Sequence, residues 1–394
     1  MKQKTFFNCF ILSFLALSFA KAQNIQFEDA NFKALLLSAS PENEIAEDAN
    51  GNAVAIDTNG DGEISQTEAL NIYQLSIYDL STPYIADIAS MKGIEYFTNL
   101  TQLGLDYFYG LKSLDVSKNI NLQKLELGGT NIKTIDVSKN INLQGLSLND
   151  LTDTETIDVS KNINLQELSL QSDGIKTLDV SKNINLQTLN LNKDSEIKNL
   201  DVSKNINLQE LNLSWCSIKT IDVSKNVNLR NLYLNKTGIK TIDLSKNINL
   251  QILDLDGTEI KTIDASKNIS LQWLNLSSTG IKTVDVSHNI NLQLLNLGRI
   301  DKDTDADTEI KTLDVSKNIN LTALGLDGCT GLTSLYMKNG VKKIFGGDNK
   351  GYIFDGTNLN YICCDEDEIG AVKDYMGNKD NLTVTSDCGT VGTN

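Results

Sequence analysis

Apolar and polar positions alternate along this chain in units of 21 or 22 residues. One unit follows the order L-x-x-L-x-L-x-x-T-x-I, at Leu122, Leu125, Leu127, Thr130 and Ile132. Because one polar residue separates Leu125 from Leu127, both side chains lie on the same face of a strand. Ile135 and Val137 alternate in the same way in the second half of the unit. Each unit therefore predicts an inward apolar row and an outward polar one.

The string Asp-Val-Ser-Lys-Asn, with small variations, marks the second half of every unit. Its ten copies begin at Asp115, Asp136, Asp158, Asp179, Asp201, Asp222, Asp243, Asp264, Asp285 and Asp314. Repetition at this period is typical of a solenoid, in which each coil buries its apolar edges only against its neighbours. A single unit cannot bury enough apolar surface to fold alone, so the array folds together.

The second half of each unit also has strand-like spacing. Ile132 to Asn140 fit L-x-x-L-x-L-x-x-N, so each unit can supply two short strands. We therefore expect two parallel sheets on opposite sides of the coil. Asn140 falls at a corner, where its side chain can satisfy the backbone groups of the turn. Half a coil leaves no room for a long helix between repeats.

Residues 85–340 resemble the secreted bacterial leucine-rich-repeat proteins of the internalin-like type, on the L-x-x-L-x-L-x-x-T-x-I units given above. The resemblance covers most of the chain. It implies a mostly β, right-handed leucine-rich-repeat solenoid of about ten units with parallel β-sheets and short helical caps. Residues 23–84 would form the N-terminal cap and residues 341–394 the C-terminal cap, because the ends of a solenoid must be covered.

Each cap has its own apolar pattern. The N-terminal cap predicts a helix that carries Phe27, Phe32, Leu35 and Leu36. The C-terminal cap predicts a strand over residues 361–364. A helix should follow it, with one apolar face formed by Ile369, Val372, Tyr375 and Met376.

The N-terminus has the pattern of a secretory signal peptide. Lys2 and Lys4 precede an apolar run from Phe6 to Phe19, and Ala20-Lys21-Ala22 fits a small-x-small cleavage site. We expect residues 1–22 to be removed and the protein to be secreted or displayed at the cell surface, without a membrane span or lipid anchor. Removing three lysines leaves 32 basic against 51 acidic residues, a net charge of −19. This charge disfavours nucleic acid and anionic membranes as partners.

An acidic loop over residues 57–68 predicts a calcium site. Positions 1, 3, 5, 7, 9 and 12 of the loop are Asp57, Asn59, Asp61, Glu63 (through its backbone carbonyl), Ser65 and Glu68. Gly62 stands at the sharp turn, and a helix is expected over residues 66–74. The loop resembles EF-hand and dockerin loops, and we expect a structural Ca²⁺; the alternative is an acidic turn that binds nothing. A second acidic run, over residues 301–309, has no glycine turn and is interpreted as a solvated loop.

Five cysteines follow the predicted cleavage site. Cys216 and Cys329 occupy the slot that Thr130 fills in its unit, so we expect buried thiols rather than disulfide partners. Cys388 can pair with Cys363 or Cys364, and the alternative is three free thiols.

One outward strand position varies freely between units. Its residues are Lys124, Gly145, Glu167, Thr188, Glu210, Asn231, Ile252, Trp273, Leu294 and Ala323. Stacked strands would place Ile252, Trp273 and Leu294 in one exposed apolar column, with Trp215 and Tyr233 on adjoining columns. Such a patch is typical of a binding site. Alternatively, these side chains pack against a cap or against the loop of residues 300–309.

The sequence therefore predicts a binding protein rather than an enzyme. The single histidine, His288, stands where other units have lysine, and no nucleophile or phosphate-loop motif occurs. The favoured partner is a protein on the variable strand face. Two alternatives remain: carbohydrate capture by Trp215, Tyr233 and Trp273, and a structural surface rod built on the identical coils.

Overall fold

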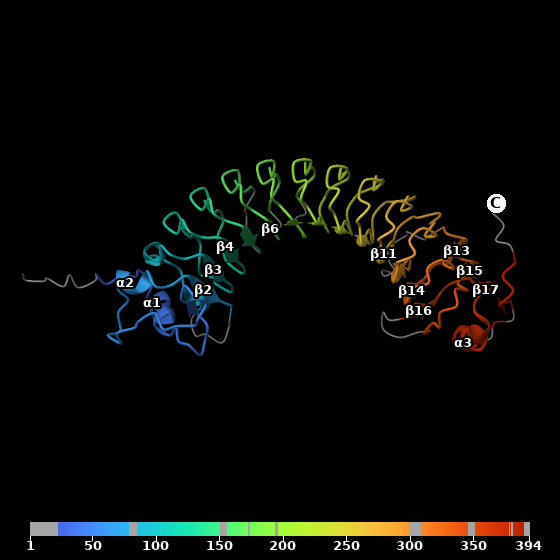
Figure 1. The fold of residues 1–394 in the computed structure, drawn as a ribbon, viewed down its shortest axis with the longest axis horizontal. Coiled ribbons are helices and arrows are strands. Elements are labelled where there is room, and N and C mark those ends of the chain that lie inside the picture. Colours follow the sequence, from blue (N-terminus) through green and yellow to red (C-terminus); the bar gives the residue numbers. More distant parts are fainter. Residues whose placement is uncertain are drawn as a thin grey trace, which may run out of the picture.

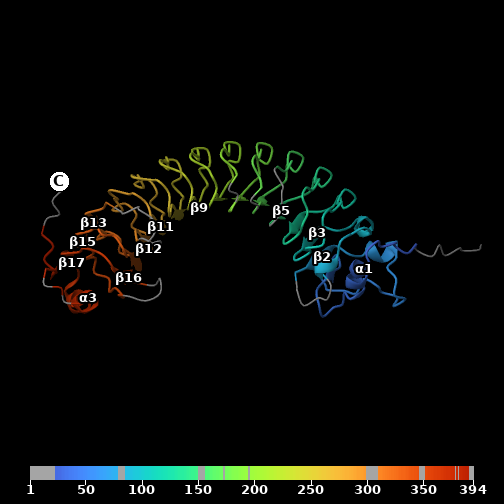
Figure 2. The same ribbon diagram turned by 180° about the vertical axis from the view of Figure 1, so that it is seen from behind.

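The chain forms a curved solenoid (Figure 1). The computed structural model describes residues 23–78, 85–149, 156–171, 174–193, 196–298, 309–345, 351–377, 379 and 381–389. Strands lie along the inner, concave side of the arch and connecting loops along its outer side, as the view from behind also shows (Figure 2). The predicted signal peptide of residues 1–22 and the acidic residues 301–307 lie outside the described residues.

One long sheet lines the concave side of the described chain. It contains 14 strands in this order: β1 (Ala46–Glu47), β2 (Gln74–Ile77), β3 (Gln102–Leu105), β4 (Lys124–Leu127), β5 (Gly145–Leu148), β6 (Glu167–Ser169), β7 (Thr188–Asn190), β8 (Glu210–Asn212), β9 (Asn231–Tyr233), β10 (Ile252–Asp254), β11 (Trp273–Asn275), β12 (Leu294–Asn296), β14 (Ala323–Gly325) and β16 (Tyr352–Ile353). All neighbours are parallel except β1 and β2. A buried leucine occupies the middle of most strands, which confirms the mostly β solenoid.

A second parallel sheet is confined to the C-terminal end of the described residues. It consists of β13 (Thr312–Asp314), β15 (Ser334–Tyr336), β17 (Tyr361–Cys363) and β18 (Thr383–Thr385). Most units thus contribute one strand rather than the two expected. In the second half of most units, neighbouring coils are joined by single backbone hydrogen bonds, such as Glu259 N–H to the carbonyl of Ile239 at 3.0 Å, and not by a continuous ladder.

Buried asparagines join the coils where the second sheet is missing. The side-chain Nδ2 of Asn140 donates to the carbonyls of Val116 at 3.0 Å and Asn119 at 2.9 Å, both one coil earlier. The equivalent asparagines of later coils make the same two bonds; they are Asn162, Asn183, Asn205, Asn226, Asn247, Asn268, Asn289 and Asn318. The corner role expected for Asn140 is confirmed.

The N-terminal cap joins directly onto the concave sheet. Its helix α1 (Ala30–Leu37) is capped by Asp29 and buries Phe32, Leu35 and Leu36, as expected. Phe27 lies before the helix and packs edge-on against Phe32. The helix expected over residues 66–74 is shorter: α2 spans Gln66–Ala69, because Gln74 already begins β2. Two short 3₁₀ turns follow, η1 (Ile85–Asp87) and η2 (Ile94–Tyr96). The sheet therefore begins inside the cap.

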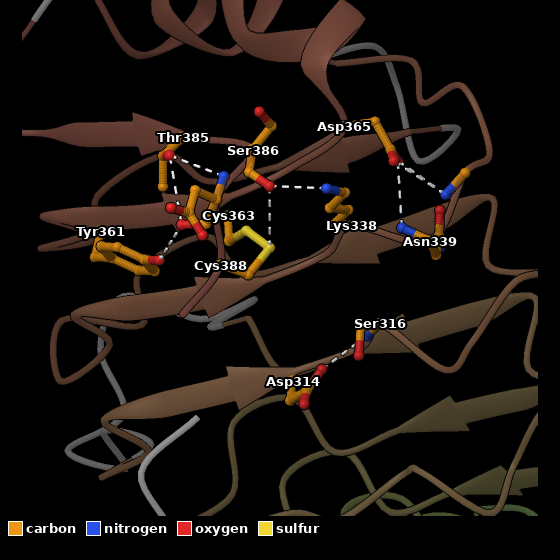
Figure 3. The surroundings of a disulfide bond; sticks show 12 residues. Asp314, Ser316, Lys338, Asn339, Tyr361, Cys363, Asp365, Thr385, Ser386 and Cys388 are labelled. Carbon is orange, nitrogen blue, oxygen red and sulfur yellow. Dashed lines mark hydrogen bonds between the residues drawn. A yellow bond between two sulfur atoms is a disulfide. The ribbon is translucent and has the colours of Figure 1, made fainter. Parts of the chain in front are cut away.

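The C-terminal cap contains the expected strand and helix. Strand β17 is followed by η3 (Glu366–Glu368) and α3 (Ile369–Met376), which buries Val372 and Met376. Because β16 completes the concave sheet, the sheet continues past residue 340. Cys363 forms the disulfide with Cys388 across the edge strand β18 (Figure 3). Nearby, Lys338 Nζ donates to the carbonyl of Ser386 at 2.8 Å.

The remaining thiols are buried. Cys216 and Cys329 lie in the inward slot expected for them, and their Sγ atoms donate to the carbonyls of Leu191 and Leu297, each at 3.2 Å. Burial raises the pKa of the Cys364 thiol to about 11.

Candidate functional site

The variable strand position forms a regular column on the concave sheet. In the strand register, Ile252 lies opposite Trp273, Trp273 opposite Leu294, and Leu294 opposite Ala323. Each of the first three side chains is half-buried. We call Ile252, Trp273 and Leu294 the apolar column. Its stacking follows from the constant unit length, because equal spacing keeps equivalent residues in phase from coil to coil.

A hollow of about 310 Å³ opens where the apolar column meets the C-terminal strands. Trp273, Leu294 and Ile353 supply its apolar walls, and small residues, Ala323 and Gly325, line it between them. A Cβ at Gly325 would lie 2.5 Å from the Asn296 side chain, so this position has no room for a larger residue. Sequence reasoning missed Ile353, because β16 lies in a segment without the repeat pattern.

The indole of Trp273 carries an unsatisfied donor. Its Nε1 atom is buried and has no hydrogen-bond partner among the described residues. An indole N–H can only donate, and leaving a buried donor unpaired costs about 1–3 kcal/mol. Because Trp273 lines the hollow, an acceptor on a ligand seated there could satisfy this donor if the indole ring turned toward it.

Tyr233 and Trp215 lie beside the apolar column but do not line the hollow. Tyr233 occupies the next outward column, opposite Asp254, and partial burial together with Glu210 and Asp254 raises the pKa of its hydroxyl. Trp215 stands in the turn after β8 with 56% of its surface exposed. Its φ of 68° is left-handed, which costs about 1–2 kcal/mol for a non-glycine residue. The structure therefore brings Ile252, Trp273 and Leu294 together in one column, with Tyr233 in the next column and Trp215 in the turn after β8.

Carboxylates form a polar border next to the apolar column. Burial, with the nearby charge of Asp256, raises the pKa of Asp254, although the Asn275 amide donates to Asp254 at 2.9 Å. Lys236 Nζ lies 3.3 Å from Asp256 Oδ2. The unit pattern did not reveal this border, because the position of Asp254 is Tyr233 and Asn275 in the neighbouring coils, and that of Asp256 is Asn235 and Ser277.

The acidic loop of residues 57–68 is ordered by its own backbone. Asp57 accepts hydrogen bonds from the N–H groups of Gly60 at 2.8 Å and Gly62 at 2.9 Å. Asn59 and Asp61 each accept one from the N–H two residues later, at 2.9 Å. Gly60 and Gly62 have φ values of 72° and 76°, which side chains rarely adopt, so the sharp turn depends on glycine.

The loop closes on Glu68 at the start of α2. One carboxylate oxygen accepts from Thr58 N and Oγ1, and the other accepts from Ser65 N and Oγ at 2.9 Å. Burial opposes the charged form of Glu68, but these bonds outweigh it and lower its pKa. The Glu63 side chain instead pairs with Lys33 of α1 at 2.7 Å. Only the backbone of Glu63 therefore remains for a loop ligand.

The donor set of this loop suits a hard cation. It combines two aspartates, an asparagine, a serine hydroxyl, a backbone carbonyl and Glu68, all oxygen donors of the kind that Ca²⁺ prefers. Within the described residues, no three His, Cys, Asp or Glu side chains are gathered as a metal cluster. The side chains of Asp57, Asp61 and Glu68 are therefore not gathered as such a cluster, and the oxygen chemistry of the donor set is what supports the fit.

Two solved structures share this fold. The functional domain of InlJ from Listeria monocytogenes, which includes a cysteine ladder, has a TM-score of 0.65 and 21% identity, and the match covers 92% of this chain and 82% of that one. A leucine-rich-repeat protein from Leptospira interrogans has a TM-score of 0.52 and 19% identity, with 75% and 92% covered. The sequence matches no protein-family model and no curated protein. The chain is a leucine-rich-repeat solenoid, and no helix in its described part is long and apolar enough to cross a membrane.

Proposed function

We propose that this protein is a non-catalytic binding module that holds another protein against its concave sheet. The observation that carries the proposal is the apolar column with its adjoining hollow, where the Trp273 indole N–H is buried without an acceptor. Binding hot spots are enriched in tryptophan and lie in pockets bordered by polar groups. An apolar side chain of the partner would enter the hollow, and a neighbouring carbonyl would accept from Trp273.

The proposed setting is outside the cell or on its surface. The predicted signal peptide of residues 1–22 supports export. The Cys363–Cys388 disulfide supports an oxidising compartment, because disulfides rarely persist in the cytosol.

A structural Ca²⁺ completes the proposal. Asp57, Asn59, Asp61, Ser65, Glu68 and the carbonyl of Glu63 would hold it. The ion would supply positive charge that cross-links these oxygens. Because α2 runs into β2, this loop would fix the cap on the first strands of the concave sheet.

The decisive experiment compares residues 23–394 with a triple variant in calcium-containing buffer. The variant carries Ile252→Lys, Trp273→Lys and Leu294→Lys. A matched control carries Glu167→Lys, Thr188→Lys and Glu210→Lys. These residues occupy the same column on three consecutive strands, β6, β7 and β8, earlier in the chain. Partners captured from surface and host-cell extracts are identified by mass spectrometry, purified and titrated.

We expect the triple variant to lose at least about 30-fold in affinity, as loss of a hot spot does, while the control retains binding. Circular dichroism melting checks that both variants fold. Equal affinity of parent and triple variant would refute the concave site. A signal on a glycan array that Trp273→Lys removes would favour carbohydrate capture. Self-association without any partner would favour a structural rod.

A further inference from the structure

Three columns of nearly identical residues run along one flank of the solenoid, where the chain enters each strand; Ser270 interrupts the second column and Thr322 ends the third. We call them together the amide flank. The first, which we call the isoleucine column, contains Ile120, Ile141, Ile163, Ile184, Ile206, Val227, Ile248, Ile269, Ile290 and Ile319. The second contains Asn121, Asn142, Asn164, Asn185, Asn207, Asn228, Asn249, Asn291 and Asn320. The third contains Gln123, Gln144, Gln166, Gln187, Gln209, Arg230, Gln251, Gln272 and Gln293.

The isoleucine column is exposed in every coil. Its side chains are between 46% and 57% exposed, and the column continues through ten successive coils. Single exposed apolar residues are common, but a continuous apolar stripe bordered by polar groups marks an interaction surface. The repeat offers no reason to keep a branched apolar side chain half in water at each level.

The asparagine column is held in a fixed orientation. Asn142 Nδ2 donates to the carbonyl of Ile120 one coil earlier at 3.1 Å, and Asn207 does the same to Ile184 at 3.2 Å. Each of these amide nitrogens thus donates to a carbonyl one coil earlier, which fixes the orientation of an exposed side chain. Side chains that are already ordered lose little entropy when a ligand binds, so this row is preorganised.

The glutamine column has the spacing of adjacent strands. The backbone N–H of Gln144 donates to the carbonyl of Gln123 at 2.7 Å, and that of Gln209 to Gln187 at 2.8 Å. Neighbouring levels of the flank are therefore about 4.8 Å apart. The side chains border two polar hollows of about 430 and 380 Å³, the larger one between Gln187 and Gln251.

We propose that the amide flank binds a linear, uncharged, β-linked polysaccharide that lies along the solenoid with about one sugar ring per coil. The ring hydroxyls would bond to the amides of the second and third columns, and the apolar ring faces would lie on the isoleucines. Arg230 is the single charge in the three columns, so nothing on the flank calls for a charged ligand. The flank borders the concave sheet, but it does not include Ile252, Trp273 or Leu294 of the proposed protein site.

The spacing of the flank favours a sugar chain over a peptide. A pyranose ring in an extended β-1,4-linked chain advances by nearly the distance between two coils, so the rings stay in step with the coils. Successive rings are turned over, so in a two-fold chain every second ring presents the same edge to the amides. An extended peptide advances about 3.3 Å per residue and soon falls out of step with levels about 4.8 Å apart. Identical levels, which carry little information for a protein partner, are what a polymer of identical rings requires.

The experiment measures binding of β-1,4-linked glucan, xylan and mannan oligosaccharides by calorimetry to residues 23–394. The flank variant carries Gln187→Ala, Gln209→Ala, Arg230→Ala and Gln251→Ala. The control carries Thr220→Ala, Thr241→Ala, Thr262→Ala and Thr283→Ala, four exposed residues of another column of the same coils. All eight positions are outside the buried core, and thermal melting verifies the fold of each variant.

We expect at least one of the three series to bind, with about tenfold higher affinity for six rings than for two, because each added ring contacts one more coil. The flank variant should lose about tenfold in affinity and the control should lose none.

The proposal fails if no series binds or if affinity is independent of chain length. It also fails if Trp273→Lys, rather than the flank variant, removes binding, since the sugar would then lie on the concave sheet. Vesicle binding or self-association that Ile206→Ser and Ile248→Ser remove, with no sugar bound, would assign the flank to a lipid or to a second copy instead.

Discussion

The side-chain amide of Asn205 donates to the main-chain carbonyl of Asn183, one coil earlier, at 2.9 Å. The same Nδ2 atom reaches the carbonyl of Val180 at 3.0 Å, and the side chain is fully buried. Because most coils make no backbone ladder on the outer side of the arch, this repeated contact joins them there. It takes over the role that a second sheet would have had.

Replacing a buried asparagine of this ladder should destabilise the solenoid. Asn205→Ala removes two hydrogen bonds between neighbouring coils, while the two carbonyls keep the backbone N–H donors of Asn183 and Leu186. At about 0.5–1.5 kcal/mol for each bond, we expect the free energy of unfolding to fall by about 1–3 kcal/mol. Asn207→Ala is the matched control, because Asn207 is exposed and makes one bond, to Ile184. Its loss should stay below about 1 kcal/mol. Urea denaturation measures both, and equal losses would show that the ladder contributes nothing special.

The repeated aspartates should make stability depend on acid pH. The hydroxyl and backbone N–H of Ser138 donate to Asp136 and lower its pKa, and most equivalent aspartates are held in the same way. A carboxyl group with a lower pKa in the folded state stabilises it above the unfolded value, near 3.9, and this contribution disappears as pH falls through the folded value. We therefore expect the melting temperature to fall progressively below about pH 4.

Serine substitution provides the control for this effect. Ser138→Ala, Ser160→Ala and Ser181→Ala together remove three hydroxyl donors and leave the backbone donors in place. The melting temperature of this variant should vary less between pH 5 and pH 3 than that of the parent. Identical pH profiles would mean that these hydroxyls do not set the acid sensitivity.

The repeat pattern predicted most of the fold because every unit has the same order of apolar and polar positions. The L-x-L spacing placed the concave strands, and the constant unit length placed Ile252, Trp273 and Leu294 in one column. The inward slot of Cys216 and the corner position of Asn140 followed from the same alignment. These features depend on local period and stacking, which a sequence shows directly.

Features that depend on curvature or on the caps were not accessible in this way. The spacing of Ile132 to Asn140 is compatible with a strand, but in most units this half makes only single backbone hydrogen bonds to its neighbours. Ile353 belongs to the binding hollow because the chain returns to the concave sheet after residue 340, where no repeat remains to indicate it. The repeated isoleucines of the amide flank can be recognised in the sequence, but the exposure of their side chains depends on how the turn is oriented.

Calcium should stabilise the N-terminal cap. If the ion binds the loop of residues 57–68, saturating Ca²⁺ adds a binding free energy to the folded state alone, about 2.7 kcal/mol at a hundredfold excess over the dissociation constant. We expect a higher melting temperature in Ca²⁺ than in chelator. Asp57→Ala should abolish the difference. Asp48→Ala is the control, because Asp48 also accepts backbone hydrogen bonds within the cap but lies outside the loop. A parent protein that melts at the same temperature with and without Ca²⁺ would disprove the site.

A buried ion cluster should hold the C-terminal cap together. The side chain of Lys343 is 1% exposed, and its Nζ lies 3.0 Å from Glu368 and 3.1 Å from Asp365. Lys343→Met would leave these carboxylates without their cation, and breaking such a buried pair costs about 3–5 kcal/mol. Lys338→Met is the control, because Lys338 is exposed and donates to the carbonyl of Ser386. We expect it to lose less than about 1 kcal/mol in urea denaturation.

The pH dependence of this loss separates charge from packing. Burial opposes the charged form of Asp365, but Lys343 and the N–H groups of Asn339 and Gly340 outweigh it and lower its pKa. In the parent, the resulting stability is present above the ordinary aspartate pKa and is lost as pH falls through the lower folded value. Without Lys343, Asp365 loses the cation that lowers its pKa. The difference in unfolding free energy between parent and Lys343→Met should therefore be largest near neutral pH and shrink towards pH 3. A difference that stays constant over this range would mean that Lys343 stabilises the cap through its aliphatic packing and not through its charge.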